Sequence, residues 1–235
     1  MNINKFDIVS NLNQNFIVIG FFTPNYRPLA EQFAKNLREQ NISFHLYARS
    51  FMEGNWAHQT LQKPSVLMNA RLDYPRMPLI FMDVDCQVRG DISEIVGLRG
   101  DFILPIGRKP MKNGTGLRPG TRVMVVKPTP ESDIFLAAWN EKCRLSLNPV
   151  GNDEIRLQMA LEECAGHFSF SVLPRKFNGQ ELRKAEINDV IIHDSARDEM
   201  RFAGAIRKNL KSIFRRVRNL IYQVITGNDY ARRKN

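Results

Sequence analysis

A short apolar run that ends in two carboxylates limits the possible fold of this chain more than any other feature. Leu79 to Met82 reads Leu-Ile-Phe-Met, and Asp83-Val-Asp85 follows directly. A continuous apolar run of this length is typical of a buried central strand in a parallel sheet. Residues i and i+2 of a strand point to the same face, so both carboxylates are expected to reach one point beyond the strand's C-terminal end.

Two hard oxygen ligands at that point suit Mg²⁺ or Mn²⁺ bound to a diphosphate. The alternative is that the two acids cap the following segment or lie in a turn. The buried strand before them favours the functional interpretation, because ionisable groups at buried strand ends are common at active sites.

The remaining pattern predicts an α/β fold with a mostly parallel sheet. A continuous apolar strand at 16–22 and a second strand at 43–47 enclose an amphipathic helix at 29–39, and the three segments together form a β-α-β unit. Residues 107–121 are rich in glycine, proline and basic residues and are expected to form a long loop. Further strands are expected at 101–106, 122–126, 168–173 and 190–192, and further helices near 64–72, 91–96, 133–144 and 153–161.

The composition indicates an ordinary globular protein, since 43% of the 235 residues are hydrophobic and 25% are charged. Three widely spaced cysteines, Cys86, Cys143 and Cys164, do not suggest a disulfide framework or a zinc ribbon. The sequence shows neither a signal pattern at its start nor an apolar run of about 20 residues. These features lead us to expect a cytoplasmic protein.

The net charge of +10 is concentrated at the end of the chain. Residues 201–235 contain ten Lys and Arg residues but one acid, Asp229, whereas residues 1–200 are nearly neutral. We therefore divide the chain into a domain at 1–200 and a basic tail at 201–235. Apolar residues of the tail recur at spacings of three and four, which predicts a basic amphipathic C-terminal helix.

Two interpretations of the tail stay open. In the first, the tail helix packs on the domain and its charged residues face solvent. In the second, the helix lies in the anionic surface of the inner face of a membrane. Each basic residue near such a surface contributes about 1 kcal/mol, so five would contribute about 5 kcal/mol. Nucleic acid is not an expected partner, because the nearly neutral domain offers no second basic surface.

The order of the motifs resembles the nucleotide-diphospho-sugar transferases, which are glycosyltransferases of GT-A fold with a D-x-D motif. The resemblance is strongest over about residues 60–197. It implies a GT-A-like, Rossmann-like fold and metal-dependent transfer of a sugar from a nucleotide-diphospho-sugar, preferably a UDP-sugar, to a glycan or lipid-linked acceptor. It rests on Phe81-Met-Asp-Val-Asp85, Gly114-Thr-Gly116, Trp139, Gly151-Asn-Asp-Glu154, Leu173-Pro174, Phe177-Asn178 and Ile192-His-Asp-Ser-Ala-Arg197.

The same resemblance implies a metal site and a donor site. Asp83 and Asp85 would hold a Mn²⁺ or Mg²⁺ ion and the donor's ribose or diphosphate, and His193 would be a late metal ligand. His193 follows an apolar run, so it also lies at a strand end, although a structural histidine is the alternative. The other histidines, which we interpret as structural, are His45, His58 and His167.

Asp153 and Glu154 are the catalytic candidates by this resemblance, because they open a helix where one acid would face the acceptor or the anomeric carbon. An inverting enzyme would use one of them as a base on the acceptor hydroxyl, whereas a retaining enzyme would need no base there. Glu154 replaces a common Gln, so the choice between the two acids stays open. The alternative is plain capping of the helix.

Several further residues are candidates for contacts with the substrates. Lys63 and Arg71 would bind near the diphosphate, or both are solvated charges on a helix. Thr23 and Tyr26 are placed to hold the base and ribose. The remaining candidates are Gly114, Thr115 and Gly116 for the shape of the pocket, Arg108, Lys109 and Lys112 for an anionic acceptor, and Arg197 for a donor phosphate.

Two other functions compete with this interpretation. A phosphotransferase of the haloacid-dehalogenase type also places D-x-D after a strand, but Cys86-Gln87 departs from its pattern and two βα units precede the motif here. A non-catalytic, membrane-associated binding domain is the second alternative. The presence of Asp83, Asp85 and His193 together argues against it.

Overall fold

The structure is a computed structural model that describes residues 4–52, 56–111, 114–144, 152–179, 186 and 188–193. The chain divides into two compact units, Met1–Asp194 and Ser195–Asn235, and every described residue belongs to the first unit. The predicted helix in 201–235 and the candidate Arg197 therefore lie outside the described residues. No helix in the described part of the chain is both long enough and apolar enough to cross a membrane.

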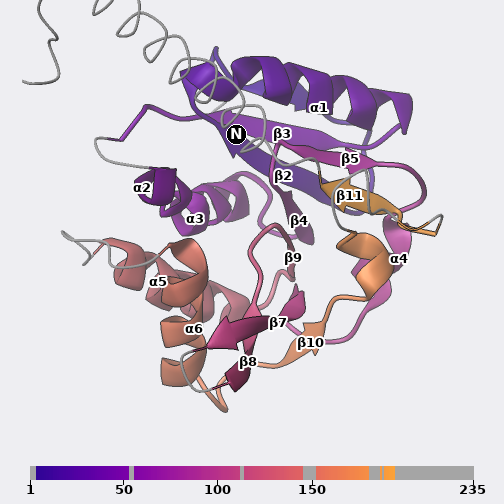
Figure 1. The fold of residues 1–235 in the computed structure, drawn as a ribbon. Helices are drawn as coiled ribbons and strands as arrows, with labels where there is room; N and C mark the ends of the chain where they lie inside the picture. Colours follow the sequence, from indigo (N-terminus) through magenta and orange to yellow (C-terminus); the bar gives the residue numbers. More distant parts are fainter. Residues whose placement is uncertain are drawn as a thin grey trace, which may run out of the picture. The chain divides into compact units, whose positions relative to one another are not determined.

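A seven-stranded sheet with the order β1-β3-β2-β4-β9-β6-β10 forms the centre of the first unit (Figure 1). Strands β1 and β9 run antiparallel to their neighbours, and the other five run in one direction, which confirms the predicted mostly parallel sheet. The strands are β1 (Ile8–Ser10), β2 (Ile17–Phe22), β3 (Phe44–Ala48), β4 (Leu79–Met82), β6 (Phe102–Leu104), β9 (Val123–Val126) and β10 (Phe170–Val172).

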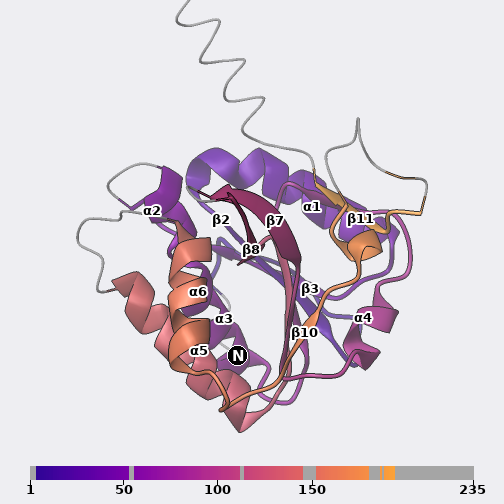
Figure 2. The same ribbon diagram turned by 60° about the horizontal axis from the view of Figure 1, so that its bottom comes forward.

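Helices cover both faces of this sheet (Figure 2). Helix α1 (Arg27–Glu39) packs on one face, and the other face packs against α3 (Lys63–Asp73), α5 (Pro130–Arg144) and α6 (Asp153–Glu163). Ile80 and Met82 of β4 belong to the first core, whereas Leu79 and Phe81 belong to the second. Because both faces are buried, the strand reads as a continuous apolar run instead of an alternating one.

Smaller elements lie around this sheet. Strands β5 (Cys86–Val88) and β11 (Ile191–His193) form an antiparallel ribbon. Helices α2 (Trp56–Thr60) and α4 (Ser93–Gly97) are short, and 3₁₀ turns occur at Pro24–Tyr26 and Arg175–Phe177.

The prediction of a long loop at 107–121 is wrong. Strands β7 (Ile106–Met111) and β8 (Gly114–Pro119) pair there as an antiparallel hairpin. Backbone pairing forms this hairpin although its sequence lacks the apolar alternation on which a strand prediction depends.

Candidate active site

Asp83 is fixed at the carboxyl end of the central strand β4. Its amide N–H donates to the carbonyl of Arg122, 3.0 Å away, just before the neighbouring strand β9. Side chains alternate along β4, so Asp83 continues the row of Leu79 and Phe81 on the face that α3 covers. The carboxylate of Asp83 therefore points toward Lys63, the first residue of α3.

Lys63 is almost completely buried, with 4% of its surface exposed, and its Nζ joins three parts of the site. It lies 2.9 Å from Asp83 Oδ1 and 3.0 Å from Asp153 Oδ2, and it donates to the hydroxyl and the carbonyl oxygen of Thr121, each at 3.2 Å. The prediction that Lys63 could be a solvated helix charge is thus wrong. Its ammonium group connects the end of β4, the start of α6 and Thr121, two positions before β9.

The electrostatics of this cluster follow from burial and from the number of carboxylates. Burial alone would lower the pKa of Lys63, but Asp153 and Asp83 outweigh it and raise that pKa above its usual value. Burial raises the pKa of Asp83 to about 6, and Asp85 and Asp153 add to this increase while Lys63 opposes it. The single ammonium group of Lys63 thus lies against the carboxylates of both Asp83 and Asp153. Asp83 therefore gains a proton more readily than an exposed aspartate does.

Asp153 is the first residue of α6, and it is held from three sides. Its Oδ2 accepts a hydrogen bond from the Thr121 hydroxyl at 2.5 Å in addition to the contact with Lys63, and its carbonyl oxygen accepts from Trp139 Nε1 at 3.3 Å. Only 2% of Asp153 is exposed. The neighbouring Glu154 is half-buried and so keeps more access to solvent.

Asp85 and His193 meet beside this cluster. His193 ends β11 and is the register partner of Cys86, the first residue of β5, so the ribbon brings His193 next to the residue that precedes β5. His193 Nε2 lies 3.1 Å from Asp85 Oδ2, and both side chains keep partial exposure, 15% and 17% respectively. The structure therefore brings together two residues that are more than 100 positions apart in the sequence.

This pair fits the protein's share of a divalent metal site. Within the described residues, no group of three or more His, Cys, Asp or Glu side chains is arranged to hold a metal ion. Mg²⁺ bound to nucleotides usually takes one or two carboxylates from the protein and completes its coordination with substrate phosphates and water. A carboxylate together with an imidazole also suits Mn²⁺. Asp85 and His193 are therefore suitable ligands for an ion that a diphosphate helps to bind.

Thr23 and Tyr26 lie just beyond β2, the strand next to β4. Thr23 is buried, and its hydroxyl donates to Asn25 Oδ1 at 2.6 Å. Tyr26 is half-buried at the end of the 3₁₀ turn. Gly114 and Thr115 open β8, whose hairpin leads to Thr121 through Gly120.

Arg71 does not join the site. Its guanidinium donates to the carbonyl oxygens of Met77 and Tyr74, before β4 begins, and to those of Val126 and Lys127 where β9 ends. These contacts place Arg71 at the edge of the sheet opposite Asp83. Arg71 is buried, so the alternative of a solvated charge is also wrong. Its guanidinium binds backbone carbonyl oxygens away from the acids of the site.

Sequence reasoning missed Thr121, which contacts both Lys63 and Asp153. The sequence offers only a weak indication of this role, because a threonine shortly before an apolar strand is common. Only the antiparallel pairing of β9 with β4 shows that the residues before β9 lie at the carboxyl end of β4.

No family model matches this sequence, and no curated protein matches it at a significant level. Solved structures are similar in fold. A glycosyltransferase involved in glycosylating the major capsid of PBCV-1 has a TM-score of 0.57 and 11% identity, and the match covers 78% of this chain and 94% of that one. The galactosyltransferase LgtC, solved with donor and acceptor sugar analogues, has a TM-score of 0.50 and 12% identity over 77% of this chain and 87% of that one.

The glycosyltransferase GlyE of Streptococcus pneumoniae TIGR4 has a TM-score of 0.50 and 16% identity, and the match covers 77% of this chain and 54% of GlyE. This chain therefore has the GT-A-like fold of nucleotide-sugar glycosyltransferases. The fold shared with these solved structures is the fold that the order of the sequence motifs implied.

Proposed function

We propose that the chain is a metal-dependent glycosyltransferase that moves a sugar from a UDP-sugar to a glycan or lipid-linked acceptor. The observation that carries this proposal is the position of Lys63, which links Asp83 and Asp153 next to the Asp85–His193 pair. All of these groups meet at the carboxyl end of the central strand, where open α/β sheets bind their ligands. The fold adds support, because the similar solved structures are glycosyltransferases.

Asp85 and His193 would hold a Mn²⁺ or Mg²⁺ ion, with Asp83 beside them. Such an ion offsets the negative charge that develops on the leaving nucleoside diphosphate. Three carboxylates at this site would repel a diphosphate, and the buried ammonium group of Lys63 reduces that repulsion. Because Asp153 and Thr121 already fix Lys63, this charge needs no rearrangement when the donor binds.

The two acids at the start of α6 differ in what they are able to contact. The Asp153 carboxylate is buried against Lys63 and Thr121, which suits a residue that positions Lys63. Glu154 is half-buried, so we propose Glu154 for the acceptor side. In an inverting reaction its carboxylate would take the proton of the acceptor hydroxyl.

The remaining donor contacts follow the sequence-based assignment. Thr23 and Tyr26 would hold the base and ribose at the end of β2, Gly114 and Thr115 would shape the pocket, and Arg197 would bind a donor phosphate.

Release of UDP from a panel of UDP-sugars in the presence of Mn²⁺ tests this function. We expect Asp85→Asn to lower the rate on the accepted donor by about 100-fold or more, because a ligand of the charge-stabilising ion is lost. Asp91→Asn is the matched control, since this exposed acid accepts its hydrogen bonds from the amide and hydroxyl of Ser93 and has no described contact with Asp85 or His193. An unchanged rate in Asp85→Asn would contradict the proposed site.

We further propose that residues 201–235 attach the enzyme to an anionic membrane surface, where a lipid-linked acceptor would be found. Ten basic residues against one acid in this segment support the proposal. The full chain should sediment with phosphatidylserine vesicles at low salt and not with phosphatidylcholine vesicles. A chain that lacks 201–235 should stay in solution, and sedimentation of this shortened chain to the same extent would contradict the proposal.

A further inference from the structure

Arg49 carries two buried hydrogen-bond donors for which the described part of the chain offers no acceptor. It follows β3 directly, and its backbone amide donates to the carbonyl of Phe22, the last residue of β2, at 2.9 Å. The Nε and Nη2 atoms of its guanidinium are buried and have no hydrogen-bond partner among the described residues. Burial lowers the pKa of this guanidinium, which Asp7 partly opposes. Buried donors of a charged group are almost always paired, so these two need an explanation.

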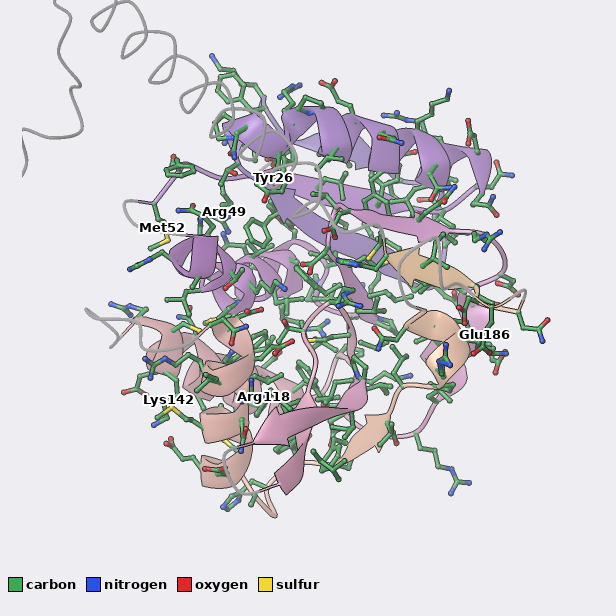
Figure 3. All side chains as sticks on the ribbon, in the orientation of Figure 1. Tyr26, Arg49, Met52, Arg118, Lys142 and Glu186 are labelled. Carbon is green, nitrogen blue, oxygen red and sulfur yellow. The ribbon has the colours of Figure 1, made fainter. Side chains whose placement is uncertain are left out.

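The position of Arg49 relative to the active site follows from strand alternation. Arg49 lies on the same face of β3 as Tyr47, and its Cζ is 5.9 Å from the centre of that ring. Tyr47 and Phe81 belong to the same core, and Asp83 continues the row of Phe81. Arg49 and Asp83 therefore lie over the same face of the sheet and at the same edge. Figure 3 labels Arg49 together with Tyr26.

One strand, β2, separates the strands that carry these two residues. Neighbouring strands are about 4.8 Å apart, so the ends of β3 and β4 are separated across the sheet by about 10 Å. This spacing is comparable to the separation of the diphosphate from the base in a nucleotide. A donor with its diphosphate at Asp85 and His193 would extend past Thr23 and bring its base to Arg49.

We propose that Arg49 recognises the base of the nucleotide donor by donating its Nε–H and Nη2–H to carbonyl oxygens of that base. The inference rests on the proposed function and names the specificity determinant of that site. A guanidinium has five donors and no acceptor, so it complements a base edge that presents acceptors. Uracil and guanine present carbonyl oxygens, whereas adenine has none. Arg49 therefore selects uracil or guanine nucleotides against adenine nucleotides.

Calorimetric titration of the full chain with UDP, GDP, ADP and inorganic pyrophosphate, each with Mn²⁺, tests this role. Wild type should bind UDP or GDP at least about 10-fold more tightly than ADP. Arg49→Met should weaken the favoured nucleotide by roughly 10- to 100-fold and change pyrophosphate, which has no base, by less than about 3-fold. Arg49→Lys keeps the charge but loses the paired donors, so it should also lose the preference over ADP.

Arg27→Met is the matched control, because Arg27 also lies near the end of β2, with its guanidinium 5.8 Å from the Phe22 ring, and is exposed. It removes the same charge and should leave the nucleotide preference intact. Equal weakening of pyrophosphate and nucleotide by Arg49→Met would assign Arg49 to the phosphates and overturn the proposal. Nucleotide binding that is indifferent to Arg49 would overturn it while leaving the proposed function intact, and failure of wild type to bind any nucleotide would overturn both.

Discussion

At the scale of single residues, the site depends on one ammonium group among several acids. Lys63 is buried and contacts the carboxylates of both Asp83 and Asp153. Removing one partner of a buried ion pair is costly, because the other charge stays buried without compensation. Lys63 therefore holds the site together as well as setting its charge.

We predict that Lys63→Met lowers the free energy of unfolding by about 3–5 kcal/mol, measured by urea denaturation. Adding Asp153→Asn to Lys63→Met should restore part of this loss, because one buried negative charge is removed. Lys176→Met is the control, since Lys176 pairs with Glu94 on the surface and should cost less than about 1 kcal/mol. Equal losses for Lys63 and Lys176 would contradict the role of Lys63.

His45 makes stability dependent on pH. Its Nε2 lies 3.0 Å from Asp7 Oδ2 and its Nδ1 lies 3.1 Å from the Tyr74 hydroxyl, and the ring is fully buried. Burial lowers the pKa of His45 below its usual value of 6.5, although Asp7 and Asp73 oppose this. The folded state therefore favours the neutral ring, with Nε2–H donating to Asp7 and Nδ1 accepting from Tyr74.

In the pH range between the lowered pKa of His45 and 6.5, the unfolded state binds the proton more readily than the folded state. The contribution of His45 to stability is therefore complete above pH 6.5 and is lost as the pH falls, at up to about 1.4 kcal/mol per pH unit. Asp83, whose pKa is raised from 3.8 to about 6, acts with the opposite sign between these two pH values. Comparing urea denaturation of wild type and His45→Gln at pH 7.5 and 5.0 isolates the effect of His45. Parallel pH profiles would contradict it.

At the scale of elements, the β5–β11 ribbon positions the Asp85–His193 pair, and α1 holds this ribbon. Asn36 of α1 donates its Nδ2–H to the Val88 carbonyl at 2.9 Å and accepts from the Val88 amide at 2.8 Å. The Asn36 side chain thus forms with Val88 the two hydrogen bonds that the backbone of a neighbouring strand would form, on the side of β5 that does not pair with β11. The ribbon is thereby connected to the β-α-β unit that opens the fold.

We predict that Asn36→Leu lowers the free energy of unfolding by about 1–3 kcal/mol and speeds hydrogen exchange at the Val88 amide, because two hydrogen bonds are lost. Lys35→Leu is the matched control on the same helix, since Lys35 is exposed and its surface ion pair with Glu39 is long, at 3.8 Å. If both variants unfolded at the same urea concentration, Asn36 would not be holding the ribbon.

The elements also show what the sequence could predict. Continuous apolar runs predicted β2, β4 and β9, because burial on both faces leaves a clear pattern in the sequence. The β7–β8 hairpin, β5 and β1 were missed. These strands are held largely by backbone pairing with another segment, and no apolar pattern in three to six residues reveals such pairing.

At the scale of the whole chain, the site could be predicted only in part. Asp83 and Asp85 could be predicted as site residues, because the apolar residues of β4 and the two acids after them form one continuous stretch of sequence. The connection of Lys63 to Asp153 was not visible, since it depends on how α3 and α6 pack on one face of the sheet. Arg71 resembled Lys63 in sequence and lies at the opposite edge, because two full turns of α3 separate them.

Calorimetric titration of UDP with and without Mn²⁺, on wild type and Asp85→Ala, tests the central claim most directly. We expect wild type to bind UDP in the presence of Mn²⁺ and much more weakly without it, and Asp85→Ala to lose this Mn²⁺-dependent binding. Binding of UDP that is indifferent to both Mn²⁺ and Asp85 would contradict a metal-dependent donor site at the end of β4, as would the absence of any UDP binding.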